Sequence, residues 1–260
     1  MADDAWDPGQ YERFHAPRSQ PFFDLLALVR RRPEMRVVDL GCGTGALTQH
    51  LHRELRARET VGIDSSTAML AQAAPLAGGG LRFEPGDIAQ FSAHGAYDLV
   101  FSNAALHWVP RHRELLGRLV DALADGGQLA VQIPANFDHA SQLVAGEVAG
   151  ELPFREALGG YLHPRHVLPP EEYAELLDHL GAREQHVRLA VYGHWLASRE
   201  EVVEWVKGSL LTDYRRRLPE ELYARFVARY RERLLPRIED RRPYFFAFKR
   251  ILFWADGLTS

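Results

Sequence analysis

The residues best suited to chemistry lie in one short stretch, VVDLGCGTGALTQHL, at residues 37–51. An apolar pair is followed by Asp39 and then by three alternating glycines, Gly41, Gly43 and Gly45. A strand that ends in a glycine-rich turn and feeds a helix leaves backbone N–H groups pointing toward a ligand. Glycine also permits positive φ and a close approach of the ligand to the backbone. The stretch therefore predicts a ligand-binding turn, since a plain β–α turn needs only one glycine.

The glycines alone leave two classes of ligand open. Residues 41–46 match the dinucleotide pattern G-x-G-x-x-(G/A), which fits a nicotinamide dinucleotide. Either class requires an acid at the end of the second strand, and the Asp64 carboxylate can accept hydrogen bonds from ribose hydroxyls. Asp39 discriminates between the classes, because a carboxylate there repels a pyrophosphate and attracts a cationic ligand. A cation that carries a ribose points to S-adenosylmethionine.

These residues must be positioned by strands. Short β-type runs alternate with helical patterns through the first two-thirds of the chain, which predicts a parallel sheet with crossover helices. We expect strands at residues 36–40, 59–64, 81–87, 97–103, 127–134, 184–194 and 244–255. Pro21 is expected to start a helix, Ser66 to cap one, and Gly126 to end one.

After residue 134 the pattern changes. Residues 135–165 are predicted to be rich in loops, with one short helix, and a further helix is expected from Pro170 to Gly181. A helical block over about 198–240 has large side chains on one face: Leu222, Phe226, Tyr230 and Leu234. Such a block either covers the sheet edge where ligands bind in open α/β folds or only stabilises the fold.

The composition is that of an ordinary globular protein, with 46% hydrophobic and 25% charged residues among 260. A net charge of −4 provides no basic field for nucleic acid or an anionic membrane. The chain has no apolar run long enough to span a bilayer, and its N-terminus lacks a signal-peptide pattern. With a single cysteine, Cys42, we expect a cytoplasmic protein without nucleic-acid or membrane partners. Nothing in the sequence indicates an oligomeric state.

Four blocks occur in the order seen in class I S-adenosylmethionine-dependent methyltransferases, and the chain resembles that family. They are VVDLGCGTG (37–45), VGIDSS (61–66), EPGDIAQF (84–91) and YDLVFSNAALHWV (97–109). More narrowly, the chain resembles the trans-aconitate methyltransferase group. That resemblance rests on WDPGQYERFHAPRSQPFFDLL, SNAALHWVPRHRELL, GGQLAVQIPANF, EEVVEWV and FKRILFW.

The resemblance implies an α/β fold with a Rossmann-like seven-stranded sheet, mostly parallel with an antiparallel C-terminal strand. A helical insertion is expected to cover the active site. We expect one methyltransferase domain over 1–260, composed of an N-terminal helical cover (about 1–32), a cofactor-binding core (about 33–134), a loop, helix and sixth strand (about 135–195), a helical insertion or substrate lid (about 196–243) and a final strand (244–256).

Carried over to the matching positions, the resemblance implies contacts with S-adenosylmethionine from Tyr11, Arg18, Asp39, Gly41, Gly43, Asp64, Ser65, Met69, Asp87, Ile88 and Asn103. Asp39 and Gly41 are expected near the methionine end, where the Asn103 backbone carbonyl meets the ammonium. Gly43 and Asp64 are expected at the ribose. The adenine is expected to lie against Ser65 and Met69. Its amino group is expected to donate to Asp87, and its ring to accept from the Ile88 N–H.

Several of these positions also have a simpler interpretation. Arg18 is implied to pair with the cofactor carboxylate and Tyr11 to close the pocket, but from the sequence alone Arg18 reads as a solvated charge. Asp87 is also a suitable N-cap for the segment that follows it. Asp64 likewise could cap a helix together with Ser65 and Ser66.

The chain departs from the trans-aconitate group at one place. The group usually has a Gly-Leu-Arg-Pro stretch after the EWV helix, whereas Thr212 and Asp213 stand here at the Arg and Pro positions. If that arginine binds a substrate carboxylate, its loss puts trans-aconitate in question as the acceptor. Residues 215–217 are three arginines that either substitute from a shifted register or form a solvated helix face.

The type of acceptor decides whether a catalytic base is needed. A carboxylate is ionised at neutral pH and needs none, whereas a hydroxyl or phenol needs a base. His107, just beyond the fourth strand, is the candidate; the alternative is a loop histidine that packs beside Trp108. We expect the acceptor to be walled by aromatic residues that otherwise belong to the core: Trp108, Trp195, Tyr214 and Tyr244. No metal site is expected, because the histidine pairs within 50–52 and 163–166 lack acidic or cysteine companions.

The sequence therefore predicts an S-adenosylmethionine-dependent methyltransferase acting on an oxygen of a small molecule, in particular a carboxylate such as trans-aconitate or a related acid. Three alternatives stay open. The first is methylation of a hydroxyl or phenol with His107 as base. The second is a methyltransferase-like binding protein without enzymatic activity, and the third is a nicotinamide-dependent oxidoreductase.

Overall fold

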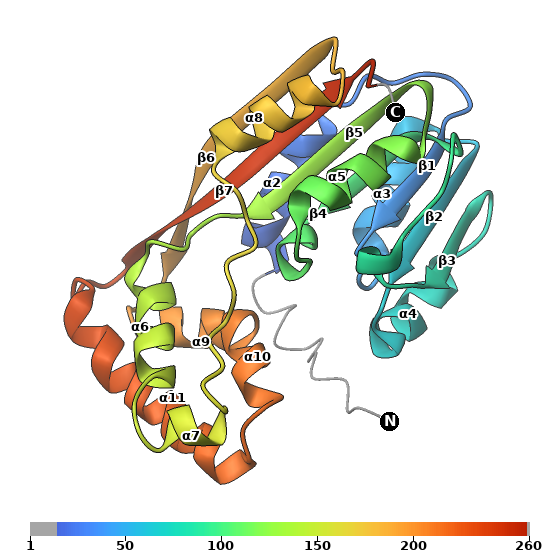
Figure 1. The fold of residues 1–260 in the computed structure, drawn as a ribbon. Helices are drawn as coiled ribbons and strands as arrows, with labels where there is room; N and C mark the ends of the chain where they lie inside the picture. The colour runs from blue at the N-terminus through green and yellow to red at the C-terminus, as the bar shows by residue number, and fades with distance from the viewer. Residues whose placement is uncertain (1–14, 259–260) are drawn as a thin grey trace. The chain divides into compact units, whose positions relative to one another are not determined.

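The computed structural model describes residues 15–258, with side chains from Ser19 onward. In this part of the chain the strands are β1 (Arg36–Leu40), β2 (Glu59–Asp64), β3 (Leu81–Pro85), β4 (Tyr97–Asn103), β5 (Leu123–Pro134), β6 (Glu184–Leu196) and β7 (Tyr244–Asp256). The α-helices are α2 (His15–Leu26), α3 (Ala46–Leu55), α4 (Thr67–Ala73), α5 (His112–Asp121), α6 (Ala140–Ala149), α7 (Phe154–Ala157), α8 (Pro170–His179), α9 (Glu201–Lys207), α10 (Leu210–Arg215) and α11 (Glu220–Leu234). Short 3-10 helices are η1 (Ala74–Leu76), η2 (Ile88–Gln90), η3 (Leu106–Trp108) and η4 (Leu235–Arg237). Figure 1 shows this order along the chain.

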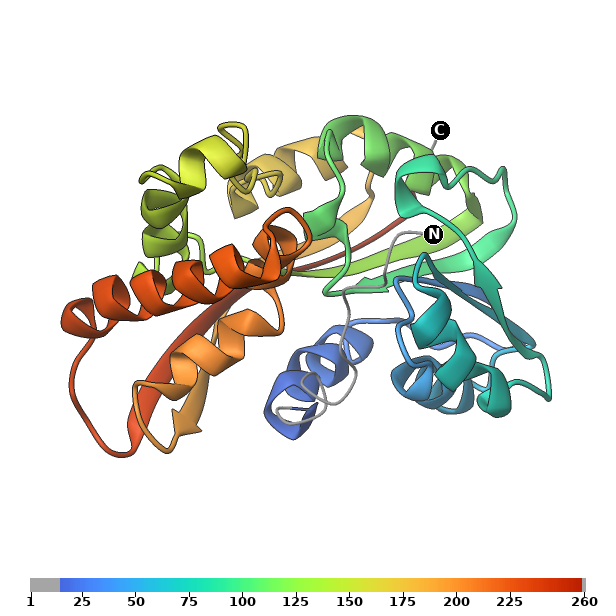
Figure 2. The same cartoon turned by 90° about the horizontal axis from the view of Figure 1, so that it is seen from below.

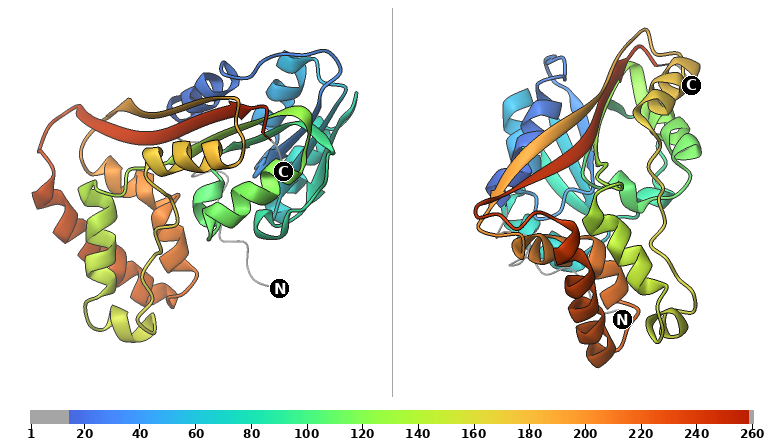
Figure 3. Two further views of the ribbon diagram at one scale, coloured as in Figure 1. Left: turned by 45° about the horizontal axis from the view of Figure 1, so that its top comes forward. Right: turned by 90° about the vertical axis from the view of Figure 1, so that its left-hand side faces the viewer.

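The strands of residues 15–258 form one seven-stranded sheet in the order β3-β2-β1-β4-β5-β7-β6. The pairs from β3 to β5 are parallel, and β7 is antiparallel to β5. At the edge, β7 and β6 run side by side (Figure 3). This confirms the predicted fold, a mostly parallel sheet with an antiparallel C-terminal strand. The strand order reverses between β1 and β4, and in open α/β sheets ligands bind outside the carboxyl ends of the strands at such a reversal.

Burial explains why these segments become central strands. Val37, Val38 and Leu40 of β1 are completely buried, as expected for a parallel strand that is covered on both faces. Helices α5 and α8 cover one face, and α2 and α3 cover the other (Figure 2). On the second face, the Phe22 ring of α2 packs edge-on against Phe101 of β4, with 5.4 Å between ring centroids.

The described chain divides into two compact units, each with its own hydrophobic core. Residues 18–135, 166–190 and 250–258 form the core unit. Residues 15–17, 136–165 and 191–249 form the helical unit. Strands β6 and β7 each contribute residues to both units.

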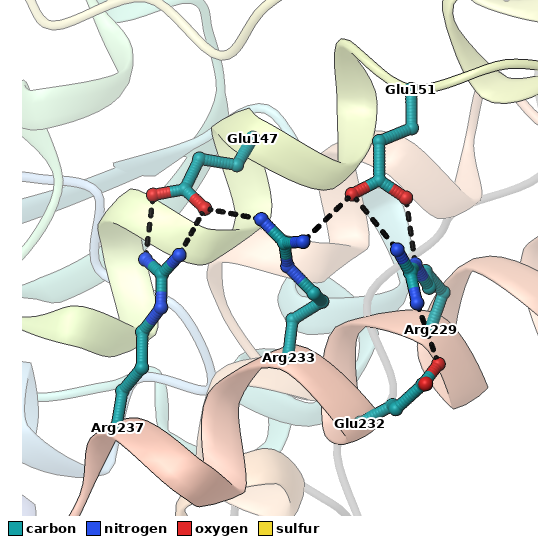
Figure 4. A network of polar contacts seen from close by, with 6 residues as sticks. All are labelled: Glu147, Glu151, Arg229, Glu232, Arg233 and Arg237. Atoms are coloured by element: carbon teal, nitrogen blue, oxygen red, sulfur yellow. Dashed lines mark hydrogen bonds and ion pairs between the residues drawn. The ribbon is translucent and has the colours of Figure 1, made fainter.

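The helical unit is built on the apolar face predicted for residues 198–240. Phe226, Tyr230 and Leu234 of α11 are completely buried, and Tyr230 donates a 2.9 Å hydrogen bond to the Ser141 carbonyl of α6. Beside this contact, a row of arginines on α11 and η4 pairs with Glu147 and with the glutamate that follows α6 (Figure 4). The two helices are therefore held by apolar packing and by an ion-pair row.

Two sequence predictions about helix ends are wrong. Helix α2 begins at His15, so Pro21 lies inside it, although a proline there removes one backbone donor. Helix α5 ends at Asp121, and β5 begins at Leu123, so Gly126 (φ 69°) lies within the strand instead of ending the helix. The segment 135–165, expected to be rich in loops with one short helix, contains two helices, the ten-residue α6 and the four-residue α7. None of the helices within residues 15–258 is long and apolar enough to cross a bilayer.

Candidate active site

The glycine turn lies at the carboxyl end of β1, next to the end of β4. Gly41 has φ 84°, and a Cβ built on it would lie 2.2 Å from the Cβ of Ala105, which follows β4. This turn therefore packs against the β4–α5 loop (residues 104–111) so closely that only glycine fits. Gly43 has φ 55°, and a Cβ built on it would meet nothing within 4 Å. The backbone at Gly43 thus faces open space that a ligand can enter.

Asp64 ends β2 and holds this turn in place. Its Oδ2 accepts a 2.8 Å hydrogen bond from the Gly43 N–H, and its Oδ1 accepts a 2.9 Å bond from the Ser66 N–H. A carboxylate has about four acceptor positions, so each oxygen can accept one more hydrogen bond. The cap of helix α4 is Ser66, whose hydroxyl accepts from the Met69 N–H at 3.2 Å. Asp64 can therefore organise the turn and accept ribose hydroxyls at the same time.

Asp39 supports the turn from inside the core unit. Its carboxylate is 4% exposed and accepts a 2.6 Å hydrogen bond from the Thr48 hydroxyl of α3. Burial raises the pKa of Asp39 to about 7, and the nearby charge of Asp64 adds to this effect while the Thr48 hydrogen bond opposes it. Asp39 therefore titrates near neutrality. Cys42, inside the turn, has its pKa raised mainly by burial, so its thiol is protonated and unreactive.

The residues predicted at the adenine lie at the ends of β2 and β3. Ser65 is exposed directly after β2, and Met69 is 6% exposed in α4. Asp87 begins η2 and accepts a 2.8 Å hydrogen bond from the Ala89 N–H, so it does act as an N-cap. Its other oxygen and the Ile88 N–H remain the proposed adenine contacts.

Strand register places three of the predicted polar side chains on one face of the sheet. Asp39 is level with Gly62 in β2 and with Phe101 in β4. Because side chains alternate along a strand, Asp64 and Asn103 point to the same face as Asp39, two residues further toward the carboxyl edge. The Oδ1 atom of Asn103 is buried without a hydrogen-bond partner in the described part of the chain. A ligand with hydroxyl and ammonium donors fits this edge, because there is open space at Gly43 and because Asp64 and Asn103 offer free acceptor positions. S-adenosylmethionine has both kinds of donor.

The sequence analysis missed two residues of this polar row. Asn103 is paired with Gln132 of β5, and Gln132 lies opposite Leu252 of β7, so Arg250 also points to this face. Gln132 is completely buried and Arg250 is 5% exposed, and the guanidinium donates to Gln132 Oε1 at 3.3 Å. The signal was present in the sequence, because an arginine interrupts the apolar strand YFFAFKRILFWA.

The β4–α5 loop carries His107 and Trp108 in η3. Their rings lie 4.7 Å apart, so His107 does pack beside Trp108. Two non-glycine residues with left-handed backbone, Ala104 (φ 55°) and Arg111 (φ 57°), bound the loop. The loop therefore stores backbone strain, which the surrounding structure must hold.

The other predicted site residues lie either outside the described residues or in the helical unit. Tyr11 and the Arg18 side chain lie outside the described residues. The other three belong to the helical unit. Tyr214 is 1% exposed and stacks on Phe226, Tyr244 is 7% exposed, and Trp195 is 61% exposed.

At the two positions where the chain departs from the trans-aconitate group, both side chains form hydrogen bonds within the helical unit. Thr212 is 5% exposed and donates to the Lys207 carbonyl at 3.1 Å. Asp213 accepts hydrogen bonds from Tyr161, from His163 at 2.9 Å and from Arg217 at 2.5 Å. Burial by itself raises the pKa of Asp213, but these three partners together lower it below its ordinary value.

Comparison with known proteins agrees with this geometry. The model of a methyltransferase domain matches residues 37–127. A trans-aconitate 2-methyltransferase of Deinococcus radiodurans is 45% identical over 256 residues, which are 96% of this chain and 97% of the relative. That of Variovorax paradoxus is 40% identical over 234 residues, 88% of each chain. The solved structure of the YcgJ protein of Bacillus subtilis, 14% identical, shares the fold with a TM-score of 0.60 over 92% of this chain and 99% of that chain.

These relatives cover nearly the whole chain at high identity, so the nicotinamide-dependent and non-enzymatic alternatives are set aside. The chain is an S-adenosylmethionine-dependent methyltransferase, as the glycine turn and the two aspartates predicted. The chain belongs to the family of trans-aconitate 2-methyltransferases.

Proposed function

We propose that the chain transfers a methyl group to a carboxylate oxygen of trans-aconitate or a closely related acid. The observation that carries this proposal is the 45% identity, over 96% of the chain, to a relative named trans-aconitate 2-methyltransferase. A second support comes from charge. Arg250 places a buried guanidinium on the same face as Asp39 and Asp64, close to the carboxyl ends of β4 and β5, which suits an anionic acceptor.

S-adenosylmethionine supplies, when bound, a methyl group that its sulfonium has already activated. The chain therefore has to hold the donor and the acceptor in line and exclude water, an effect worth roughly 7–11 kcal/mol. A carboxylate acceptor is ionised at neutral pH, so no side chain has to remove a proton.

For the donor we propose that Asp64 accepts from the ribose hydroxyls beside Gly43, and that Asp87 and the Ile88 N–H meet the adenine. We propose the backbone carbonyl of Asn103 as a contact of the ammonium. Ser65, Met69, Tyr11 and Arg18 complete the proposed donor contacts, and Asp39 and Gly41 shape the methionine end. For the acceptor, Trp108, Trp195, Tyr214 and Tyr244 remain proposed contacts.

The test is a product assay with labelled S-adenosylmethionine. We expect a base-labile methyl ester of trans-aconitate, and weaker activity on acids with fewer carboxylates. Replacing Arg250 by Gln should raise the KM for the acid about tenfold and leave cofactor affinity unchanged, because one charge-assisted contact is lost. The proposal is wrong if no carboxylic acid in the set is methylated while calorimetry shows normal cofactor binding.

A second candidate, methylation of a hydroxyl or phenol, is favoured by the place of His107 in the β4–α5 loop. It predicts that His107→Ala abolishes turnover and that the rate falls in acid as the imidazole is protonated. Carboxylate methylation predicts that the same variant keeps most of its kcat. The two candidates thus differ in one measurement.

We also propose that the protein acts in the cytoplasm as an enzyme of small molecules, without nucleic acid. Its single cysteine is a free, buried thiol, which suits a reducing compartment, and its net charge is −4. Cell fractionation and a gel-shift assay at low salt test these two points.

A further inference from the structure

A chain of hydrogen bonds joins helix α8 to the β4–α5 loop. The hydroxyl of Tyr173 accepts from the Leu168 N–H at 3.3 Å and is hydrogen-bonded to Nδ1 of His112, the first residue of α5. The other ring nitrogen of His112, Nε2, lies 2.9 Å from the Leu106 carbonyl oxygen. All four residues belong to the core unit, and Tyr173, His112 and Leu106 are at most 2% exposed.

The directions of these hydrogen bonds follow from their partners. A carbonyl oxygen only accepts, so Nε2 of His112 carries the proton that is donated to Leu106. In the neutral ring Nδ1 is then an acceptor, and the Tyr173 hydroxyl donates to it while accepting from the Leu168 N–H. The chain is therefore satisfied only while His112 is neutral.

The Leu106 end of this chain lies in the strained loop. The Leu106 carbonyl also accepts from the Val109 N–H at 2.9 Å, which closes the η3 turn that carries His107 and Trp108. At the near end of the loop, Ala105 is the residue against which Gly41 of the cofactor turn is packed. The His112 ring thus holds a carbonyl between the cofactor turn and the two candidate acceptor residues.

We propose that His112 and Tyr173 are positioning residues that hold the β4–α5 loop in its strained conformation through the Leu168–Tyr173–His112–Leu106 chain. They touch neither donor nor acceptor. They set the distance between the cofactor turn and the acceptor side of the loop, so their loss changes kcat more than cofactor affinity. The proposal rests on the proposed function only in assigning the loop to the acceptor.

Few charged groups surround His112. Tyr173 contacts it from α8, and the charge of His166, on the segment before α8, acts on the ring. Arg113, the next residue of α5, forms an exposed ion pair with Glu172 of α8. Burial lowers the pKa of His112, and the charge of His166 lowers it further, against the hydrogen bonds to Leu106 and Val109. The ring stays neutral at neutral pH, and acid protonates it and breaks the bond from Tyr173.

The first variant is Tyr173→Phe in the full-length protein, because it removes one hydroxyl and keeps the ring that stacks 4.8 Å from Phe253. We expect hydrogen–deuterium exchange of peptides covering 104–111 to become at least tenfold faster. We expect kcat on trans-aconitate to fall about tenfold, with cofactor affinity within twofold of wild type. Without the hydroxyl that favours neutral His112, the acid limb of the rate profile should move to higher pH.

The matched control is Arg113→Gln. It breaks the exposed Arg113–Glu172 ion pair (2.5 Å), which joins the same two helices away from the loop. This control should leave exchange, kcat and the acid limb unchanged. If Tyr173→Phe behaves like the control in all three measurements, the positioning role is wrong.

A second pair of variants separates loss of the hydrogen bond to Leu106 from a general disturbance of the fold. His112→Gln keeps an N–H donor for Leu106, whereas His112→Ala keeps none, so exchange in 104–111 should be slower in the first than in the second. Equal exchange in both variants and in wild type overturns the proposal. If the wild type methylates no carboxylic acid, the proposed function fails, but the exchange measurements still decide the positioning role.

Discussion

The core unit and the helical unit surround their buried and half-buried carboxylates differently. In the core unit, the oxygens of Asp64 accept from backbone N–H groups and Asp39 accepts from one hydroxyl, and neither forms an ion pair within the described residues. In the helical unit, Asp213 is surrounded by Tyr161, His163 and Arg217. Burial raises the pKa of Asp39, whereas the partners of Asp213 lower its pKa.

The difference indicates which carboxylates serve a ligand. A buried or half-buried carboxylate without a cation costs free energy, and we propose that the two at the carboxyl edge are retained for a cationic ligand with hydroxyl groups. Asp213 has cationic and hydroxyl partners of its own and needs no ligand. From this comparison we propose that Asp39 and Asp64 serve cofactor binding and that Asp213 serves stability.

The largest expected effect comes from Gly41→Ala. The new Cβ would overlap that of Ala105 at a backbone angle of φ 84°, and we expect the free energy of unfolding to fall by about 4 kcal/mol. Gly43→Ala is the control, because its Cβ meets open space; only the left-handed backbone costs about 1 kcal/mol. The Cβ of Gly43→Ala should instead obstruct the ligand and weaken cofactor binding. Denaturant unfolding and calorimetry separate these effects, and equal unfolding costs in the two variants would contradict the close approach.

Asp64→Ala should come next. The variant loses two acceptors for ribose hydroxyls, and each such hydrogen bond contributes about 1.5 kcal/mol to binding. We therefore expect cofactor affinity to fall about 100-fold while the fold is kept. Titration calorimetry with S-adenosylhomocysteine measures this change. Asp213→Asn provides the comparison and should bind the cofactor like wild type. An unchanged affinity in Asp64→Ala would show that the ribose lies elsewhere.

Asp39 and Asp213 should show opposite dependence on pH. Folded Asp39 has a pKa of about 7, whereas the ordinary value for this carboxyl is 3.8. The folded state therefore holds an extra proton between these values, and stability falls as pH rises through them. Asp39→Asn should therefore raise the free energy of unfolding at pH 8 by roughly 2 kcal/mol and change it little at about pH 3, below both pKa values.

For Asp213 the sign is reversed. Its pKa is lowered in the folded state, so its contribution is complete above the unfolded value and is lost as pH falls below it. Asp213→Asn should lower the free energy of unfolding at pH 8 by roughly 2 kcal/mol. Urea unfolding of both variants at pH 3, 6 and 8 makes the comparison, and parallel pH profiles would refute it.

Much of the fold and part of the site follow from local sequence. Strands β1 to β4 are short runs of five to seven residues between helical patterns, and Asp64 and the glycines stand at the ends of β2 and β1. Other features depend on contacts between distant segments. Arg250 meets Gln132 across 118 positions, and Tyr173 meets His112 across 61 positions. No local pattern specifies such a register, so the partners of these residues became visible only in the structure.

The smallest effect is expected in the ion-pair row of the helical unit. Arg233 lies between Glu147 (3.2 Å) and Glu151 (3.7 Å), and each glutamate keeps another arginine, Arg237 or Arg229, when Arg233 is removed (Figure 4). The Arg233 side chain is 37% exposed, so Arg233→Gln should lower the free energy of unfolding by only about 0.5 kcal/mol. This difference should vanish in 1 M salt, where exposed pairs are screened. A loss of unfolding free energy as large as that of Asp213→Asn, or one that persists in salt, would contradict this comparison. It would mean that the ion-pair row stabilises the helical unit as much as the partners of Asp213 do.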